Sequence, residues 1–242
     1  MIQPDFTEFK RLAKQGNLIP VYDVFSADLL TPVSAYLRIA QGARYSFLLE
    51  SVEGGEKIAR YTFCGANPEE IFRYAKGACV LESHDHLLWE ERDPVTFLRE
   101  RIARFRPVRL PGLPPLVAGA IGYFSYDMVR LIERLPARLR DDIGLYDAQL
   151  MFYHGLLAFD HVQHRLWVVR NVYTEGPGSL RAKYTRKWSR FGRATPPDPL
   201  PPWPRRWPRD YAPRAFPIPT FSWVAPIPRR RIWWSVITEL GH

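Results

Sequence analysis

Cysteine is nearly missing from this sequence, and its scarcity narrows the class of protein. Only Cys64 and Cys79 occur among the 242 residues, and neither lies in a CxxC pair or near a cluster of histidines. This pattern argues against a disulfide-stapled secreted domain and against a cysteine-based zinc site. We expect two free thiols in a cytoplasmic protein; the alternative is one isolated disulfide between them.

Long hydrophobic runs are also missing. No stretch of about 18 uncharged apolar residues occurs, so the sequence predicts no membrane-spanning helix and no membrane partner. The first residues, MIQPDFTEFKRLAKQGN, are polar and include acids. A secretory signal peptide would instead have a basic start followed by an apolar region, so we expect none here.

The common short motifs of catalysis are absent too. The sequence contains no GxxxxGK[ST], no GxGxxG and no GxSxG. His84 and His86 flank an aspartate, and His161 and His164 lie three residues apart in DHVQHR. Both pairs fall in expected turns between strands, where solvated side chains are normal, so we predict no metal site and no catalytic residues in this chain.

Acidic residues are scarce only toward the C-terminal end. From Thr185 onward the sequence has 11 of its 34 lysines and arginines but only 3 of its 25 acidic residues. The formal net charge of +9 is therefore concentrated there, and the preceding residues are nearly neutral. Bulk charge does not select a nucleic acid as the partner of residues 1–184.

The composition changes at the same point. Residues 185–242 hold 12 of the 23 prolines and 6 of the 8 tryptophans. Such proline density excludes regular helix and interior strand, whereas disordered tails have few aromatic residues. Proline, arginine, tryptophan and alanine share GC-rich codons, so we hypothesise that this irregular tail is an out-of-frame translation. The alternative is a basic, aromatic arm that binds nucleic acid or membrane.

Residues 1–184 have the pattern of an ordinary folded region. Helices are indicated by apolar spacing at residues 5–15, by Thr31-Pro32 before a periodic segment that stops at Gly42, and by Asp93-Pro94 before residues 95–105. Short apolar segments with glycine turns indicate antiparallel strands between these helices. We therefore predict an α+β fold of antiparallel sheets with flanking helices.

Two later segments carry more specific expectations. GAIGYFSYDMVRLIERLP has Gly119 and Gly122 in a strand, where glycine permits close backbone approach. Residues 128–135 are then expected to form a helix with Asp127, Arg130 and Glu133 as a charge ladder along one face. Residues 149–174 are expected to form two apolar strands joined by the polar turn DHVQHR.

The segment SFLLESVEGGEK ends a strand with chemistry suited to a ligand. Leu49 is followed by the carboxylate Glu50 and the hydroxyl Ser51, and a glycine turn then leads to Lys57. An acid, an alcohol and an ammonium match the charged ends of a small zwitterion. The alternative is a strand that surfaces into a turn, with a Glu50–Lys57 surface pair worth about 0–1 kcal/mol.

Three motifs together resemble a known family. TPVSAY at 31–36, SFLLESVEGGEKIARYTFCGANPEE at 46–70 and AGAIGYFSYDMVRLIERLP at 118–136 resemble the N-terminal region of anthranilate synthase component I, over roughly residues 5–184. Related chorismate-using enzymes, such as aminodeoxychorismate synthase, share parts of the pattern, so a fragment of such an enzyme is an alternative. The resemblance implies that residues 1–184 form the tryptophan-regulatory region of the large-subunit fold.

The resemblance also implies a ligand and roles for four residues. The LLES segment belongs to the feedback site for the inhibitor L-tryptophan in this family. Glu50 would accept hydrogen bonds from the ammonium, Ser51 and Lys57 would hold the carboxylate, and Pro32 would fix the start of a helix beside the ligand. Apolar neighbours would cover the indole.

For the whole enzyme, the resemblance implies a carbon–oxygen lyase that converts chorismate and ammonia to anthranilate and pyruvate. Its cofactor would be Mg²⁺, and its partner a glutamine amidotransferase subunit, component II, which the region around Gly119–Pro136 could face. The elements that bind Mg²⁺ and chorismate lie in the family's C-terminal half and are not found here. We therefore expect a truncated chain without Mg²⁺ and without activity of its own. A non-enzymatic basic binding protein that uses the tail is the second class of function.

Overall fold

The fold is built from two antiparallel sheets. The computed structural model describes residues 1–50, 60–83, 86–135, 144–189 and 233–237. The five-stranded sheet has the order β1 (Leu18–Ser26), β10 (Arg165–Tyr173), β9 (Gly155–Asp160), β3 (Tyr61–Ala66) and β2 (Ser46–Leu49). The six-stranded sheet has the order β11 (Trp233–Ile237), β7 (Gly119–Phe124), β8 (Ala148–Tyr153), β4 (Glu70–Ala75), β5 (Ala78–Ser83) and β6 (Leu87–Glu91).

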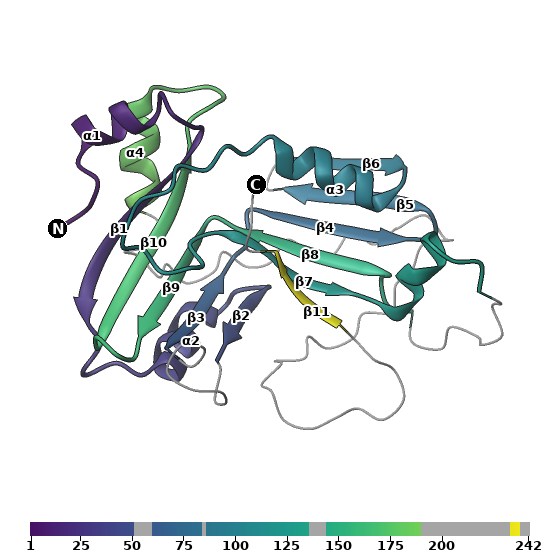
Figure 1. Cartoon of the computed structure of the whole chain (residues 1–242), viewed down its shortest axis with the longest axis horizontal. Coiled ribbons are helices and arrows are strands. Elements are labelled where there is room, and N and C mark those ends of the chain that lie inside the picture. Colours follow the sequence, from purple (N-terminus) through teal and green to yellow (C-terminus); the bar gives the residue numbers. More distant parts are fainter. Residues whose placement is uncertain (51–59, 84–85, 136–143, 190–232, 238–242) are drawn as a thin grey trace.

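Helices flank these sheets, and the predicted α+β class is confirmed (Figure 1). They are α1 (Phe6–Leu12), α2 (Pro32–Ala40), α3 (Pro94–Ala103), α4 (Leu180–Ser189) and the short 3₁₀ helix η1 (Tyr126–Leu131). None of the described helices combines the length and apolarity that a bilayer crossing requires.

The helix starts follow from local capping chemistry. Thr31 and Ser34 form a reciprocal capping box at the start of α2, with Pro32 in its first turn. At α3, the carboxylate of Asp93 accepts a hydrogen bond from the Thr96 backbone N–H at 2.7 Å. Each cap satisfies a backbone donor that the first helical turn leaves without an intrahelical partner. Both predicted cap–proline starts are therefore confirmed.

The main core lies between the inner faces of the two sheets. Successive residues of a strand point to opposite faces, and the burial follows this period of two. In β8, Tyr153 faces the inner core while Phe152 faces α3; in β9, Leu156 faces the inner core while Leu157 faces α2. This alternation assigns one face of each sheet to the other sheet and the opposite face to a helix.

The helices cover the outer faces. Phe97 of α3 stacks on Phe72 of β4 with ring centroids 5.4 Å apart, and Figure 1 shows α3 lying along β4 and β5. Ala35 of α2 is buried against the outer face of the five-stranded sheet. Tyr184 of α4 packs on Phe9 of α1, with ring centroids 5.1 Å apart. Both cysteines are free and buried, and burial raises the pKa of Cys64 to about 12.

The expectation of two strands in residues 149–174 is wrong. The chain forms three strands, because β8 ends at Tyr153 and β9 begins at Gly155 in the other sheet. His154 lies at this crossing, and its carbonyl accepts the backbone N–H of Asn171 at 2.5 Å. Both halves are equally apolar, so periodicity does not reveal where the chain changes sheet.

The helix expected over residues 128–135 is also shorter than predicted. Only η1, at Tyr126–Leu131, is helical, and it has 3₁₀ geometry. Arg130 makes the expected contact with Asp127 at 2.8 Å and also donates to the carbonyl of Leu135 at 2.8 Å. The second bond satisfies a carbonyl just beyond η1, where the chain has already left helical geometry.

The predicted boundary at residue 184 falls inside α4. Lys183 donates to the carbonyls of Thr174, Glu175 and Gly176 at 2.6–2.9 Å, and the Tyr184 hydroxyl donates to the carbonyl of Pro4 at 3.0 Å. These bonds tie α4 to the folded region. Within the tail, β11 pairs with β7 at the edge of the six-stranded sheet. The division at residue 184 and the proposed origin of the tail stay predictions.

Replacement of Gly122 by alanine should destabilise the six-stranded sheet. A Cβ at this position would lie 1.9 Å from the backbone oxygen of Gln149 on β8, so the two strands would have to separate. We expect a loss of about 3 kcal/mol in the free energy of unfolding, measured by urea denaturation. Gly77→Ala is the control, because its φ of +83° makes alanine unfavourable by about 1 kcal/mol while the surrounding space is open. An equal loss in both variants would contradict the close-approach explanation.

Candidate functional site

The sequence points to the end of β2 as the candidate site. β2 is an edge strand that pairs with β3, and its last residue, Leu49, lies opposite Phe63. Glu50 follows directly and is exposed, while Pro32, the first residue of α2, is half-buried. Ser51 and Lys57 lie outside the described residues, so the proposed ligand roles of all four residues stay predictions.

Helix α2 is joined to β2 by a polar contact. The hydroxyls of Tyr36 in α2 and Ser46 in β2 are 3.1 Å apart. Ala35, the preceding residue of the helix, is buried against the sheet. Because Thr31 and Pro32 determine where α2 begins, this contact relates the helix start to the strand that ends at Leu49. Pro32 thus belongs to the helix that contacts β2, and Glu50 is the residue that directly follows β2.

An ion pair between the buried Asp160 and the half-exposed Arg60 anchors the beginning of β3. Arg60 directs its guanidinium at Asp160, with Nη2 2.6 Å from Oδ2 and Nε 3.1 and 3.2 Å from the two carboxylate oxygens. Asp160 is 2% exposed and also accepts the backbone N–H groups of Val162 and Gln163. Burial alone would raise the pKa of Asp160, but these hydrogen bonds and the charge of Arg60 outweigh it and lower the pKa.

A second charged cluster lies where β2 begins. Glu82 of β5 accepts hydrogen bonds from both Arg44 at 2.8 Å and Arg73 at 2.7 Å, and Arg73 also donates to the Tyr45 hydroxyl at 3.1 Å. Burial opposes the ionisation of Glu82, yet the hydrogen bonds and charges of the two arginines lower its pKa. We call these four residues the Glu82 clasp.

Sequence reasoning missed both charged clusters. Arg73 interrupts the apolar segment EIFRYA, and Asp160 ends the apolar segment LLAFD. A charged residue inside or at the end of a buried strand was the available signal, because such a charge needs a partner. The identity of each partner depends on pairing between distant strands, which local patterns do not determine.

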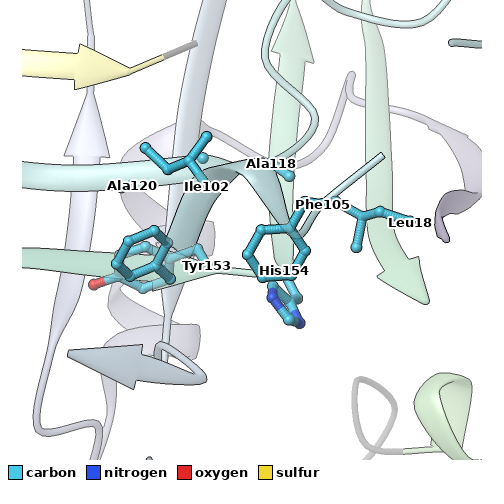
Figure 2. Close-up of a pocket in the computed structure, with 9 residues that line it drawn as sticks. Leu18, Ile102, Phe105, Ala118, Ala120, Tyr153 and His154 are labelled. Atoms are coloured by element: carbon cyan, nitrogen blue, oxygen red, sulfur yellow. The ribbon is translucent and has the colours of Figure 1, made fainter. Parts of the chain in front are cut away.

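The described residues also form an apolar hollow away from β2. Figure 2 shows it between α3 and the strands β7 and β8, with the rings of Phe105 and His154 at one side. The lining residues are Leu18, Ile102, Phe105, Ala118, Gly119, Ala120, Phe152, Tyr153 and His154. It has no lysine, arginine or carboxylate side chain in its lining, so it offers no counter-charge for a zwitterion.

The described residues form no cluster of metal-ligand side chains. Across residues 1–50, 60–83, 86–135, 144–189 and 233–237, no three histidine, cysteine, aspartate or glutamate side chains come together as metal ligands. His161 instead pairs its Nε2 with the Thr62 hydroxyl at 2.8 Å.

Comparison with known proteins identifies the family. The model of the chorismate binding enzyme family matches residues 44–216. The chain therefore belongs to the chorismate-binding enzymes.

Within that family its relatives include anthranilate synthase component 1 of Acetivibrio thermocellus, 37% identical over 177 residues, which are 73% of this chain and 36% of that protein. The Thermus thermophilus protein of the same name is 40% identical over 151 residues, 62% of this chain and 31% of that one. The resemblance read from the three motifs is thus confirmed.

A solved structure was found as well. The crystal structure of anthranilate synthase component I from Streptococcus pneumoniae is 27% identical in sequence, with a TM-score of 0.44 over 69% of this chain and 35% of that chain. Our chain spans about a third of the length of the curated relatives it matches.

The Asp160→Asn variant tests the anchor of β3. Asparagine keeps an oxygen for the N–H groups of Val162 and Gln163 but removes the charge that faces Arg60, so we expect a loss of about 1–3 kcal/mol at pH 7. Because the folded-state pKa of Asp160 is lowered, its stabilisation is present above the unfolded pKa of about 3.9 and is lost as the pH falls through the folded value.

Urea denaturation at pH 7 and pH 3 measures both effects. The difference between the parent and Asp160→Asn should be smaller at pH 3. Asp127→Asn, which breaks the exposed pair with Arg130, is the control and should cost about 0–1 kcal/mol. A difference for Asp160→Asn that is the same at both pH values would show that its charge does not act as described.

Proposed function

We propose that this chain carries the L-tryptophan-binding, regulatory part of an anthranilate synthase component I. The single observation behind the proposal is the start of the LLES segment, where Leu48 and Leu49 end β2 and the exposed Glu50 follows directly. Support comes from the family match and from the relatives named anthranilate synthase component 1. Those names favour this enzyme over aminodeoxychorismate synthase.

The ligand's chemistry explains why these residue types would bind it. A desolvated ammonium needs acceptors, which Glu50 and the carbonyls near the end of β2 would supply. The carboxylate needs donors, which Ser51 and Lys57 would supply. A buried polar group left without a partner costs about 1–3 kcal/mol, so the site would discriminate strongly against ligands that lack either end. Leu48 and Leu49 are half-buried on opposite faces of β2, so one of them would supply apolar surface for the indole.

The activity of the whole protein is part of the same proposal. It would act in tryptophan biosynthesis, in the cytoplasm, and convert chorismate and glutamine-derived ammonia to anthranilate and pyruvate. Its partner would be the amidotransferase subunit, component II, and Mg²⁺ would assist the departure of the hydroxyl group.

Calorimetry of the purified 242-residue chain with L-tryptophan tests the regulatory site. Glu50→Gln loses one charge-assisted hydrogen bond, worth about 1.5–3 kcal/mol, so this variant should bind tryptophan about tenfold more weakly or worse. Ser51→Leu should abolish binding, because the larger side chain would fill the space for the ligand's carboxylate. Glu91→Gln is the matched control, since Glu91 is also exposed at the end of an edge strand, β6. The proposal fails if the parent chain binds no tryptophan at millimolar concentration or if Glu50→Gln binds as the parent does.

An activity assay tests the division between regulation and chemistry. With chorismate, Mg²⁺ and ammonium supplied, the purified chain should produce no anthranilate, because we assign the chorismate site to the part of the relatives that this chain does not span. Anthranilate fluorescence is the readout, and a full-length component 1 from a relative is the positive control. Product formed by the 242-residue chain at a rate proportional to its concentration would overturn this assignment.

A further inference from the structure

The Glu82 clasp joins β2 to the other sheet. Arg44 and Tyr45 directly precede β2 in the five-stranded sheet, whereas Arg73 and Glu82 belong to β4 and β5 of the six-stranded sheet. Arg73 is opposite Val80, and Glu82 is opposite Ile71, so both side chains project from the same face of that sheet. Every hydrogen bond of the clasp that involves Arg44 or Tyr45 therefore fastens the start of β2 to the neighbouring sheet.

The side chains of the clasp become more exposed from the six-stranded sheet toward β2. The side chain of Arg73 is 9% exposed, that of Glu82 33% and that of Arg44 46%. Arg73 is held further by the ring of Tyr146, 5.6 Å from its guanidinium carbon. The six-stranded sheet thus supplies the more buried half of the clasp, and Arg44, which precedes β2, supplies its most exposed member.

Strand β2 needs such a fixed point. It has four residues and pairs only with β3 among the described strands, so its own ladder holds it weakly. Phe47 in its middle is anchored edge-on to Tyr153, with ring centroids 4.7 Å apart. At about 3.3 Å per residue, Glu50 lies about 16 Å beyond Tyr45 along the strand. With Phe47 as a pivot, a shift at the start of β2 moves its end.

We infer that Arg44 and Glu82 are positioning residues, which set the location of the strand end at Glu50 and thereby the affinity of the site there for a free amino acid. We assign neither residue a contact with the ligand. This inference rests on the proposed function for the identity of the ligand, but the anchoring of β2 is independent of it. Because Glu82 belongs to the other sheet, the clasp also makes the site sensitive to how the two sheets sit on each other.

Charge-removing variants of the full chain test this role. Glu82→Gln and Arg44→Met should weaken L-tryptophan binding about three- to tenfold, in line with the loss of a partly exposed ion-pair network. Arg44→Lys, which keeps the charge, should restore most of the affinity. In both charge-removing variants, the backbone amides of residues 46–49 should exchange hydrogen faster than in the parent.

Glu70→Gln is the matched control. Glu70 lies on β4 and is held by Arg101 of α3, with side chains 15% and 19% exposed, but this pair is on the outer face of the sheet. It should lower the unfolding temperature without changing tryptophan affinity or exchange in residues 46–49. This contrast separates positioning from general stability.

The two readouts keep this inference distinct from the proposed function. If the parent binds no tryptophan, the proposed function fails, and exchange alone decides whether the clasp anchors β2. Unchanged exchange in Glu82→Gln relative to Glu70→Gln would overturn the inference. Faster exchange with unchanged tryptophan affinity would overturn it as well, because the clasp would then hold the strand without positioning the site.

Discussion

The ring of Phe47 occupies the space that Gly65 leaves by having no side chain. A Cβ on Gly65 would lie 2.4 Å from the ring carbon Cε1 of Phe47, so alanine there would displace the ring. The same ring packs edge-on against Tyr153 of the other sheet. One aromatic side chain thus ties the edge strand β2 to its neighbour β3 and to β8 across the core. The position of Glu50, three residues further on, depends on this contact.

Local features of the fold were predictable from sequence, and distant pairings were not. Thr31-Pro32 and Asp93-Pro94 predict helix starts because capping involves residues within one turn of each other. The crossing at His154 was missed because β8 and β9 are both apolar, and only their partners distinguish them. The candidate site likewise has a part that local motifs predict and a part that depends on distant pairings. Its strand and helix were found from motifs, whereas the clasp required the register of β4 and β5.

The Arg60–Asp160 pair and the Glu82 clasp contact opposite ends of the antiparallel pair formed by β2 and β3. Arg60 and Asp160 hold the chain where it enters β3, and the Glu82 clasp holds it where it enters β2. Ion pairs of this kind add little net stability, because desolvation offsets most of the Coulomb attraction. Their geometry is nevertheless specific, since the fork of Arg60 meets both carboxylate oxygens of Asp160. Position is therefore the property that these pairs contribute most.

Position is also what a regulatory site needs when it is separate from the chemistry. A free amino acid changes an enzyme's activity only if it binds one arrangement of the protein better than another. A strand end without contacts to the other sheet would bind its ligand without changing the arrangement of the rest of the chain. Here β2 is connected, through the packing of Phe47 on Tyr153 and the ion pair of Arg44 with Glu82, to a second sheet whose outer face carries α3. In the proposed function, a ligand that selects one position of β2 would therefore also select one arrangement of the two sheets, and this coupling would let binding at Glu50 act at a distance.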